Sequence, residues 1–171
     1  MNQLAHHCLA VQLAPCLAAG APSRVVVVAS SAARWPGADQ ALQAALDGSK
    51  FSGPPWAPYA GSKLANVAWS RAAARRWASA GITVAALHPD IAPSGLQRHM
   101  GVLGATLNAL TAAVGGSRDA SAARVVAAAT AAEPHAFALQ GATDAALEER
   151  VWAAGDAALR SGDVLSGGGV K

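Results

Sequence analysis

The chain has 171 residues, of which 53% are hydrophobic and 13% are charged, with a formal net charge of +3 at pH 7. This length fits one domain with a buried core, and the composition excludes an intrinsically disordered chain. Basic residues do not alternate with aromatic ones, and no apolar run is long enough for a membrane span, so neither a nucleic-acid surface nor a membrane helix is expected.

The N-terminal residues 2–19 carry apolar side chains at helical spacing, which predicts a helix with a candidate kink at Pro15. Its apolar stretch is interrupted by Gln12 and Pro15 and follows no Lys or Arg, which argues against a signal peptide. His6 and His7 are adjacent, so on a helix they point apart and would chelate a metal poorly. No Cys/His spacing typical of a metal site occurs either, so no metal is expected.

Two short apolar runs are predicted to be buried parallel strands. The first is the valine run within Ser23 to Ser31, and the second is Ile82 to Leu87. Between them, residues 32–57 are rich in Gly and Pro and are predicted to form a surface connection with one short helix at 38–46. Residues 59–79 have almost no helix breakers and are predicted to form a long helix.

The helix at 59–79 carries the only arginine cluster, at Arg71, Arg75 and Arg76, which the sequence alone suggests is a solvated helix face. Beyond the second strand, the loop HPDIAPSGL leads to an apolar, helical stretch at 101–115, a helix at 117–132, a possible third strand at 135–139 and a final helix at 143–160. This alternation predicts an α/β fold with parallel strands and right-handed crossovers.

The segment YAGSKLAN places Tyr59, the only tyrosine, one helical turn before Lys63. Side chains four residues apart on a helix share a face, with their Cβ atoms about 5–6 Å apart. A lysine ammonium there stabilises a phenolate, and such a tyrosine can give a proton to a carbonyl or take one from an alcohol. The spacing by itself also occurs by chance in many helices, so other residues must support the assignment.

RVVVVASS, a long loop, YAGSKLANV and GITVAALHPDIAPSGLQRH together resemble the second half of the short-chain dehydrogenase/reductase (SDR) family. The KLAN and HP…RH sequences are most similar to its retinol-dehydrogenase-like branch. NQLAHH resembles the N-x-L-G-H-F helix start of that branch, with Ala5 for glycine and His7 for phenylalanine. The resemblance spans residues 2–99 and continues more weakly to about residue 160, where ERVWAAGDAAL resembles the C-terminal helix of the branch.

The resemblance implies a catalytic set of Asn2, Ser31, Tyr59 and Lys63. Tyr59 would be the acid/base, and Lys63 would favour its phenolate and hydrogen-bond the nicotinamide ribose. Ser31, with Ser30 as the competing candidate, would hold the substrate oxygen at the carboxyl end of the first strand. Asn2 would anchor a water that links Lys63 to solvent, although a helix cap is the alternative role for an Asn at this position.

The same resemblance implies that the loop after the second strand contacts the nicotinamide through Pro89, Asp90, Ile91 and Ser94. Asp90 stands where the family usually has glycine, and a carboxylate beside a phosphate-bearing cofactor is electrostatically unfavourable. The resemblance implies NADP or NAD as the cofactor. The choice between them stays open in this sequence, because the residues that make it belong to the cofactor-binding half of the family's domain.

The glycine-rich turn TGxxxGxG, which receives the cofactor pyrophosphate in this family, does not occur in the sequence. The expected fold is therefore a partial Rossmann-like doubly wound parallel sheet of about three strands with flanking helices, in which the N-terminal βαβ cofactor half is absent. We expect one incomplete domain: a catalytic core segment at 2–99, a substrate-side cover at 100–116, C-terminal helices and an edge strand at 117–160, and a flexible tail at 161–171.

Two functions follow from these expectations. The first is an NAD(P)-dependent oxidoreductase that interconverts a lipophilic alcohol and carbonyl; the apolar cover suits such a small-molecule substrate, although a core or dimer-face helix would have the same composition. The second is a non-catalytic, truncated SDR remnant that cannot bind the cofactor alone and acts, if at all, through a partner chain; without the glycine-rich turn we expect the chain alone to be inactive. In that case the valine-rich strand would expose an unpaired edge, open to a partner strand or to a second copy of the chain.

Overall fold

The computed structural model describes residues 3–89, 117–130 and 143–162, and all structural statements below refer to these residues. In chain order the elements are α1 (Leu4–Ala19), β1 (Ser23–Val28), the 3₁₀ helix η1 (Ser31–Arg34), α2 (Ala38–Asp47), α3 (Ala57–Trp77), the 3₁₀ helix η2 (Ala78–Ala80), β2 (Ile82–Leu87), α5 (Arg118–Thr130) and α6 (Ala145–Ser161).

The two strands form a parallel sheet in which Ser23 lies opposite Ile82 and Val28 lies opposite Leu87. The connection from β1 to β2 runs through η1, α2 and α3, as expected for parallel strands, which need a crossover. The fold is α/β with flanking helices, consistent with a partial Rossmann-like sheet, and this confirms the predicted fold class. The third strand expected at 135–139 and the helix expected at 101–115 lie outside the described residues.

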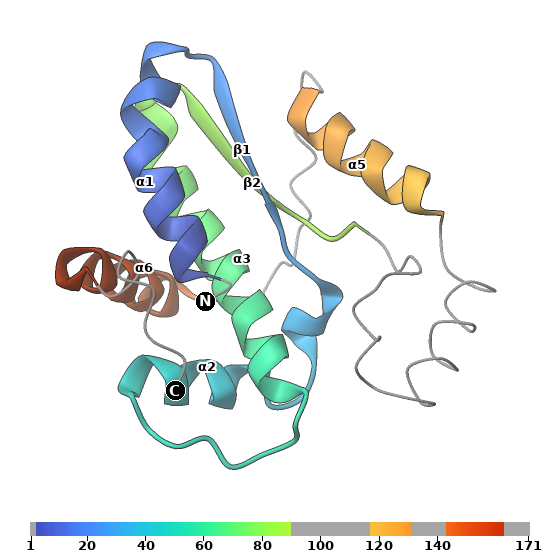
Figure 1. Ribbon diagram of the computed structural model, residues 1–171, viewed down its shortest axis with the longest axis vertical. Coiled ribbons are helices and arrows are strands. Elements are labelled where there is room, and N and C mark those ends of the chain that lie inside the picture. The colour runs from blue at the N-terminus through green and yellow to red at the C-terminus, as the bar shows by residue number, and fades with distance from the viewer. Residues whose placement is uncertain (1–2, 90–116, 131–142, 163–171) are drawn as a thin grey trace.

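Helices cover both sides of the sheet: α1 and α3 lie on one side and α5 lies on the other (Figure 1). Because side chains alternate along a strand, Val25 and Val27 point to the core with α3, whereas Arg24 reaches α5 and donates to the Ala128 carbonyl at 3.1 Å. The helix α3 contributes more buried residues than any other described element, including Leu64 and Trp69, so it is the central element of the core.

Most element bounds agree with the predicted ones, and the differences have local causes. Helix α1 continues through Pro15. Strand β1 ends at Val28 because Ser30 adopts an extended conformation and its side chain caps η1, accepting from the Ala32 N–H at 3.2 Å. Helix α3 begins at Ala57, two residues earlier than predicted, because Pro58 is compatible with a first helical turn.

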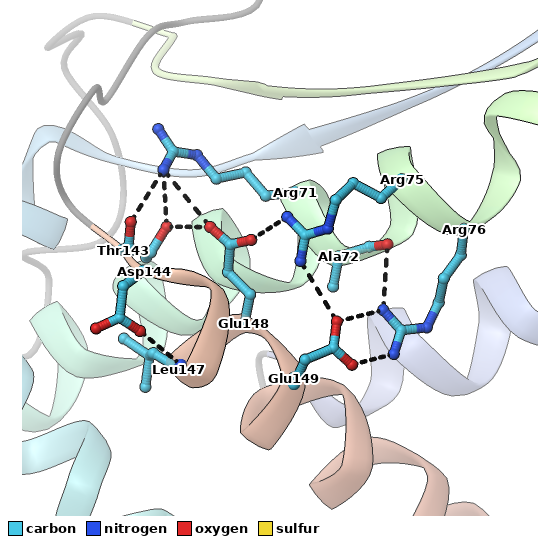
Figure 2. Close-up of polar contacts among 9 residues, drawn as sticks. All are labelled: Arg71, Ala72, Arg75, Arg76, Thr143, Asp144, Leu147, Glu148 and Glu149. Atoms are coloured by element: carbon cyan, nitrogen blue, oxygen red, sulfur yellow. Dashed lines mark hydrogen bonds and ion pairs between the residues drawn. The ribbon is translucent and has the colours of Figure 1, made fainter.

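A buried carboxylate and its neighbour hold α6 against α3 (Figure 2). The Glu148 side chain is only 4% exposed. Its carboxylate accepts hydrogen bonds from Arg75 Nη1 and, at 2.8 Å, from Thr143 Oγ1, and it lies 3.6 Å from Arg71 Nη1. On the outer side, Arg76 Nη1 donates to Glu149 Oε1 at 2.9 Å. The three arginines therefore form an ion-paired contact between two helices, and the prediction of a merely solvated face was wrong.

Replacing Glu148 by glutamine is expected to lower the free energy of unfolding by about 1–3 kcal/mol, because charge-assisted hydrogen bonds are lost at a buried position. The arginine partners are a third to a half exposed, so water can solvate them in the variant. Urea denaturation at neutral pH measures the loss. The matched control is Glu149→Gln, at a carboxylate that is 51% exposed, which is expected to change stability little. Equal losses of unfolding free energy in the two variants would show that the buried Glu148 carboxylate does not stabilise the contact between α3 and α6.

Candidate functional site

The carboxyl ends of the two strands bring together the segments that follow them. Val28 and Leu87 are paired at this edge, and the Ala29 N–H still donates to the Leu87 carbonyl at 2.7 Å. Just beyond, the Ser31 N–H donates to the His88 Nδ1 at 3.3 Å. The loop after β1 is thereby tied to the loop after β2, at the sheet edge where parallel α/β folds bind their ligands.

Tyr59 and Lys63 lie in the first two turns of α3, on the same helix face. The Lys63 Nζ lies 5.8 Å from the centroid of the Tyr59 ring and donates to the Val28 carbonyl at 3.1 Å. The pair is thus attached to the carboxyl end of β1. Burial lowers the pKa of Lys63 below its ordinary value, because it removes water from around the ammonium.

The glycine of YAGSK is explained by close packing between α2 and α3. A Cβ on Gly61 would lie 3.0 Å from both the Ala38 carbonyl oxygen and the Leu42 nitrogen, so a side chain there would push the two helices apart. The neighbouring Ser62 hydroxyl donates to the Tyr59 carbonyl at 2.7 Å within the same turn. The backbone that carries Tyr59 is therefore fixed against α2.

The predicted site residues divide into those that the structure places and those outside the described residues. Lys63 is bonded to the end of β1 and has Tyr59 beside it, while Ser31 begins η1, which packs on α3. Pro89 follows β2 at the same edge of the sheet. The remaining predicted residues, Asn2, Asp90, Ile91 and Ser94, lie outside the described residues.

Sequence reasoning missed two groups that organise this site. His88 accepts a hydrogen bond from the Ser31 backbone, and the HP dipeptide after β2 was the signal that was available for it. The Val28 carbonyl, which holds Lys63, has no signal in the sequence, because any residue type provides a backbone carbonyl.

A buried histidine joins α1, α3 and α6 behind the site. His7 is fully buried, and its Nδ1 accepts from Trp69 Nε1 at 2.9 Å. Its Nε2 lies 3.0 Å from Asp156 Oδ1, which assigns the Nε2–H tautomer because Nδ1 acts as the acceptor. Gly155 allows this approach, since a Cβ there would lie 2.5 Å from the His7 Cγ. These contacts fix α1 relative to the helix that carries Tyr59 and Lys63.

We expect stability to fall in mild acid because of His7. Burial lowers the pKa of His7 below its ordinary value of 6.5, Asp156 partly opposes this shift, and Arg76 adds slightly to it. The unfolded chain therefore binds this proton more readily than the folded chain. The contribution of His7 to stability is complete above about pH 6.5 and is lost as the pH falls towards the lower folded-state pKa.

Urea denaturation at several values between about pH 7 and about pH 5 measures this dependence. The control is His7→Phe, which keeps a ring in the site and removes the titrating group, so its slope of stability against pH is expected to be shallower. An identical slope in the two proteins would show that His7 does not cause the acid effect.

The described residues contain no cluster of three or more His, Cys, Asp or Glu side chains placed to hold a metal ion. Within the same residues, each helix is too short or too polar to cross a lipid bilayer.

Comparison with known proteins gives partial matches to oxidoreductases. The chain is 36% identical to human retinol dehydrogenase 13 over 111 residues, which is 65% of this chain and 33% of that protein. It is 37% identical over 102 residues to a probable oxidoreductase of Streptomyces lividans, and 38% identical over 104 residues to one of Streptomyces antibioticus; each match covers 58% of this chain and 32% of the relative.

The chain thus spans about a third of the length of the curated relatives that it matches. No protein-family model matches it, and no solved structure gives a significant match. The names of the relatives agree with the resemblance in the sequence, and the fold is the one that this resemblance implies. The partial matches therefore support a relationship between this chain and the retinol-dehydrogenase-like branch of the short-chain dehydrogenase/reductase family.

Proposed function

We propose that this chain carries the acid/base part of an NAD(P)-dependent oxidoreductase that interconverts an alcohol and a carbonyl. The observation that carries the proposal is the attachment of Lys63 to the carboxyl end of β1, 3.1 Å from the Val28 carbonyl, with the Tyr59 ring beside the same ammonium. A coincidental Tyr-Lys pair on a solvated helix face has no reason to lie at the edge of the sheet where α/β folds bind ligands.

Tyr59, Lys63 and Ser31 have separate parts in the proposed proton transfer. In the direction of reduction, the Tyr59 phenol gives its proton to the carbonyl oxygen, and the Lys63 ammonium stabilises the phenolate that remains. Ser31 donates a hydrogen bond to the same substrate oxygen. The Ser30 oxygen already accepts from the Ala32 N–H, and the Ser31 backbone is held by His88; both contacts favour Ser31 over Ser30 for this role.

A nicotinamide cofactor would supply the hydride that none of these side chains carries. Lys63 fits its ribose, because an ammonium has three N–H donors and the bond to Val28 uses one of them. Pro89 begins the segment that would contact the carboxamide, followed by Asp90, Ile91 and Ser94. We favour NADP over NAD. The glycine-rich turn that binds a pyrophosphate is not in this sequence, so the cofactor site made by this chain is incomplete.

The second candidate function is that of a non-catalytic chain that works only with a partner, and the open edge of β1 favours it. The N–H groups of Ser23 and Ala29 donate to carbonyls on the β2 side, so the backbone groups of Arg24 and Val26 and the N–H of Val28 face the other edge, where the Val28 carbonyl already accepts from Lys63. Within the described residues no strand pairs with that edge. A strand added there would complete the hydrogen bonds of β1.

An apolar cavity of about 400 Å³ lies along this edge between β1 and α1, lined mainly by Leu9, Leu13, Leu17 and the valines of β1. Leu9 and Leu13 are 61% and 45% exposed. An apolar strand, from a partner chain or from a second copy, would cover them. Measuring the mass of the chain by light scattering over a range of concentrations distinguishes self-association from dependence on another chain.

Titration of the purified chain with NADPH, followed by tryptophan fluorescence, separates the two functions. Micromolar binding, together with reduction of a retinal-like aldehyde, is the result expected for the oxidoreductase, and it would overturn the partner-dependent alternative. A Lys63→Met variant should bind NADPH more weakly, because it loses the donors to the ribose. If the chain alone neither binds nor reduces, even at high NADPH concentration, its acid/base residues do not work without a partner.

A further inference from the structure

The hydrogen-bond ladder between β1 and β2 is continued by a side chain where the two strands end. In a parallel pair, alternate N–H groups of one strand donate to the other, and the Ala29 N–H donates in this way to the Leu87 carbonyl at 2.7 Å. The next N–H in the same direction is that of Ser31, two residues further along. Its acceptor is the His88 Nδ1, at 3.3 Å. The His88 ring therefore adds one rung beyond the paired strands.

The Ser31 N–H needs an acceptor from elsewhere in the chain because Ser31 is the first residue of η1. The first N–H groups of a helix have no intrahelical carbonyl to donate to. In η1 the Ala32 N–H donates to the Ser30 side-chain oxygen at 3.2 Å, and the Ala33 N–H donates to the Ser30 carbonyl at 3.1 Å. Of these three N–H groups, only that of Ser31 depends on a residue from the end of the other strand, His88.

The rest of η1 is fixed by burial. Ala32 and Ala33 are 1% and 4% exposed, and η1 packs on α3, the helix that carries Tyr59 and Lys63. Ser31 is less buried than these two alanines, so packing restrains it less. The hydrogen bond to His88 supplies the missing restraint, because it holds the backbone from which the Ser31 hydroxyl projects.

We propose that His88 is a positioning residue for the Ser31 hydroxyl and acts through the Ser31 backbone. This inference rests on the proposed function, in which Ser31 donates to the substrate oxygen. An imidazole accepts at Nδ1 only in the neutral form that carries its proton on Nε2, so His88 has this tautomer in the assembled site. The restraint matters for catalysis, because a displacement of about 1 Å in a group that contacts the substrate can cost about 10²-fold in rate.

Two substitutions separate the acceptor from the ring. His88→Phe keeps a planar ring at the end of β2 and removes the acceptor. His88→Asn removes the ring and keeps an acceptor, because the amide Oδ1 is bonded to Cγ as the imidazole Nδ1 is. A purely structural role for the ring predicts that His88→Phe is the milder change, whereas the positioning role predicts that His88→Asn is the milder one.

Amide hydrogen exchange, measured by NMR in the full chain, tests the contact without any need for activity. In His88→Phe the Ser31 N–H is expected to exchange roughly 2–10-fold faster, the factor that corresponds to the net contribution of one hydrogen bond. The couplings between the Ser31 Hα and Hβ protons should change from those of one rotamer to those of a rotamer average. Both properties should stay near those of the unaltered chain in His88→Asn.

The Ala29 N–H is the internal control, because its acceptor is a backbone carbonyl that neither substitution removes. Unchanged exchange and couplings at Ser31 in His88→Phe would overturn the inference. Equal acceleration at Ala29 and Ser31 would also overturn it, since His88 would then support the strand ends in general. A His88→Asn variant that exchanges as fast as His88→Phe would overturn it too, because an acceptor at this position would not be what protects Ser31.

A double-mutant cycle with Ser31→Ala tests the role of His88 in aldehyde reduction with NADPH. His88→Phe alone is expected to lower the rate about 10–10²-fold, and His88→Asn should restore most of the loss. In the Ser31→Ala background, His88→Phe should cause no further loss, because the hydroxyl that it positions is gone. An undiminished further loss would overturn the inference. No reduction by the unaltered chain, with the exchange results as expected, would contradict the proposed function and leave the positioning of Ser31 by His88 in place.

Discussion

Replacing Tyr59 by phenylalanine is expected to lower the rate of aldehyde reduction with NADPH by about 10²–10⁴-fold, the usual contribution of one general acid. The variant removes the phenolic proton donor and keeps the ring that packs against the core. Since the defect lies in proton transfer, the affinity for NADPH should change little. Single-turnover kinetics, with NADPH absorbance as the signal, measure the chemical step directly.

A matched control for this variant is Ser62→Ala, three residues along the same helix. Its hydroxyl donates to the Tyr59 carbonyl, so the substitution perturbs the same turn without touching the proposed proton donor. We expect less than a tenfold change in this control. If Tyr59→Phe were as active as the unaltered chain, the acid/base assignment would be wrong, and the SDR-like spacing would be only an inherited feature of the helix.

Replacing Trp69 by alanine is expected to lower the free energy of unfolding by about 3–5 kcal/mol, the typical cost of truncating a buried tryptophan. Trp69 is 1% exposed and stacks on Trp152 with ring centroids 6.1 Å apart, and Trp77 lies 5.8 Å away on another side. The variant also removes the Trp69 Nε1–H group that donates to His7 Nδ1, and this leaves a buried imidazole nitrogen unsatisfied.

Chemical denaturation followed by circular dichroism measures this loss, because the variant also removes one of the fluorescent tryptophans. The control is Trp56→Ala, at a side chain that is 50% exposed and precedes α3, where a change within about 0.5 kcal/mol is expected. Similar losses in the two variants would mean that the tryptophan cluster does not hold α1, α3 and α6 together in solution.

The Tyr59 and Trp69 variants test two different positions along α3. Tyr59 lies at the start of α3, where the helix faces the strand ends, and Trp69 lies where it meets α1 and α6. If α3 is a rigid support, Trp69→Ala should impair both stability and activity, whereas Tyr59→Phe should impair activity alone.

Much of the fold follows from local patterns in the sequence. The valine run and ITVAAL specify buried strands because their residues are β-branched or apolar without a polar face. The repeat of apolar residues along α3 specifies a helix, and the spacing of Tyr59 and Lys63 on it follows from helical geometry alone. In these cases the controlling interactions lie within a few residues of each other, so the pattern carries the information.

The arginine cluster shows what local sequence patterns do not predict. Arg71, Arg75 and Arg76 lie on one face of α3, but the residues that pair with them lie more than seventy positions later, on and just before α6. Nothing near the arginines in the sequence distinguishes a solvated face from an ion-paired one, because the difference depends on which helix packs there.

The sequence by itself determined the described strands and helices and the spacing of the proposed acid/base pair, because backbone propensity and side-chain periodicity are local properties. Only the tertiary structure decided that Lys63 binds the Val28 carbonyl, that His88 holds Ser31, and that Trp69 donates to the buried His7. Each of these contacts joins segments that are distant in sequence, and two of them use backbone atoms that every residue has, so packing alone selects the partner.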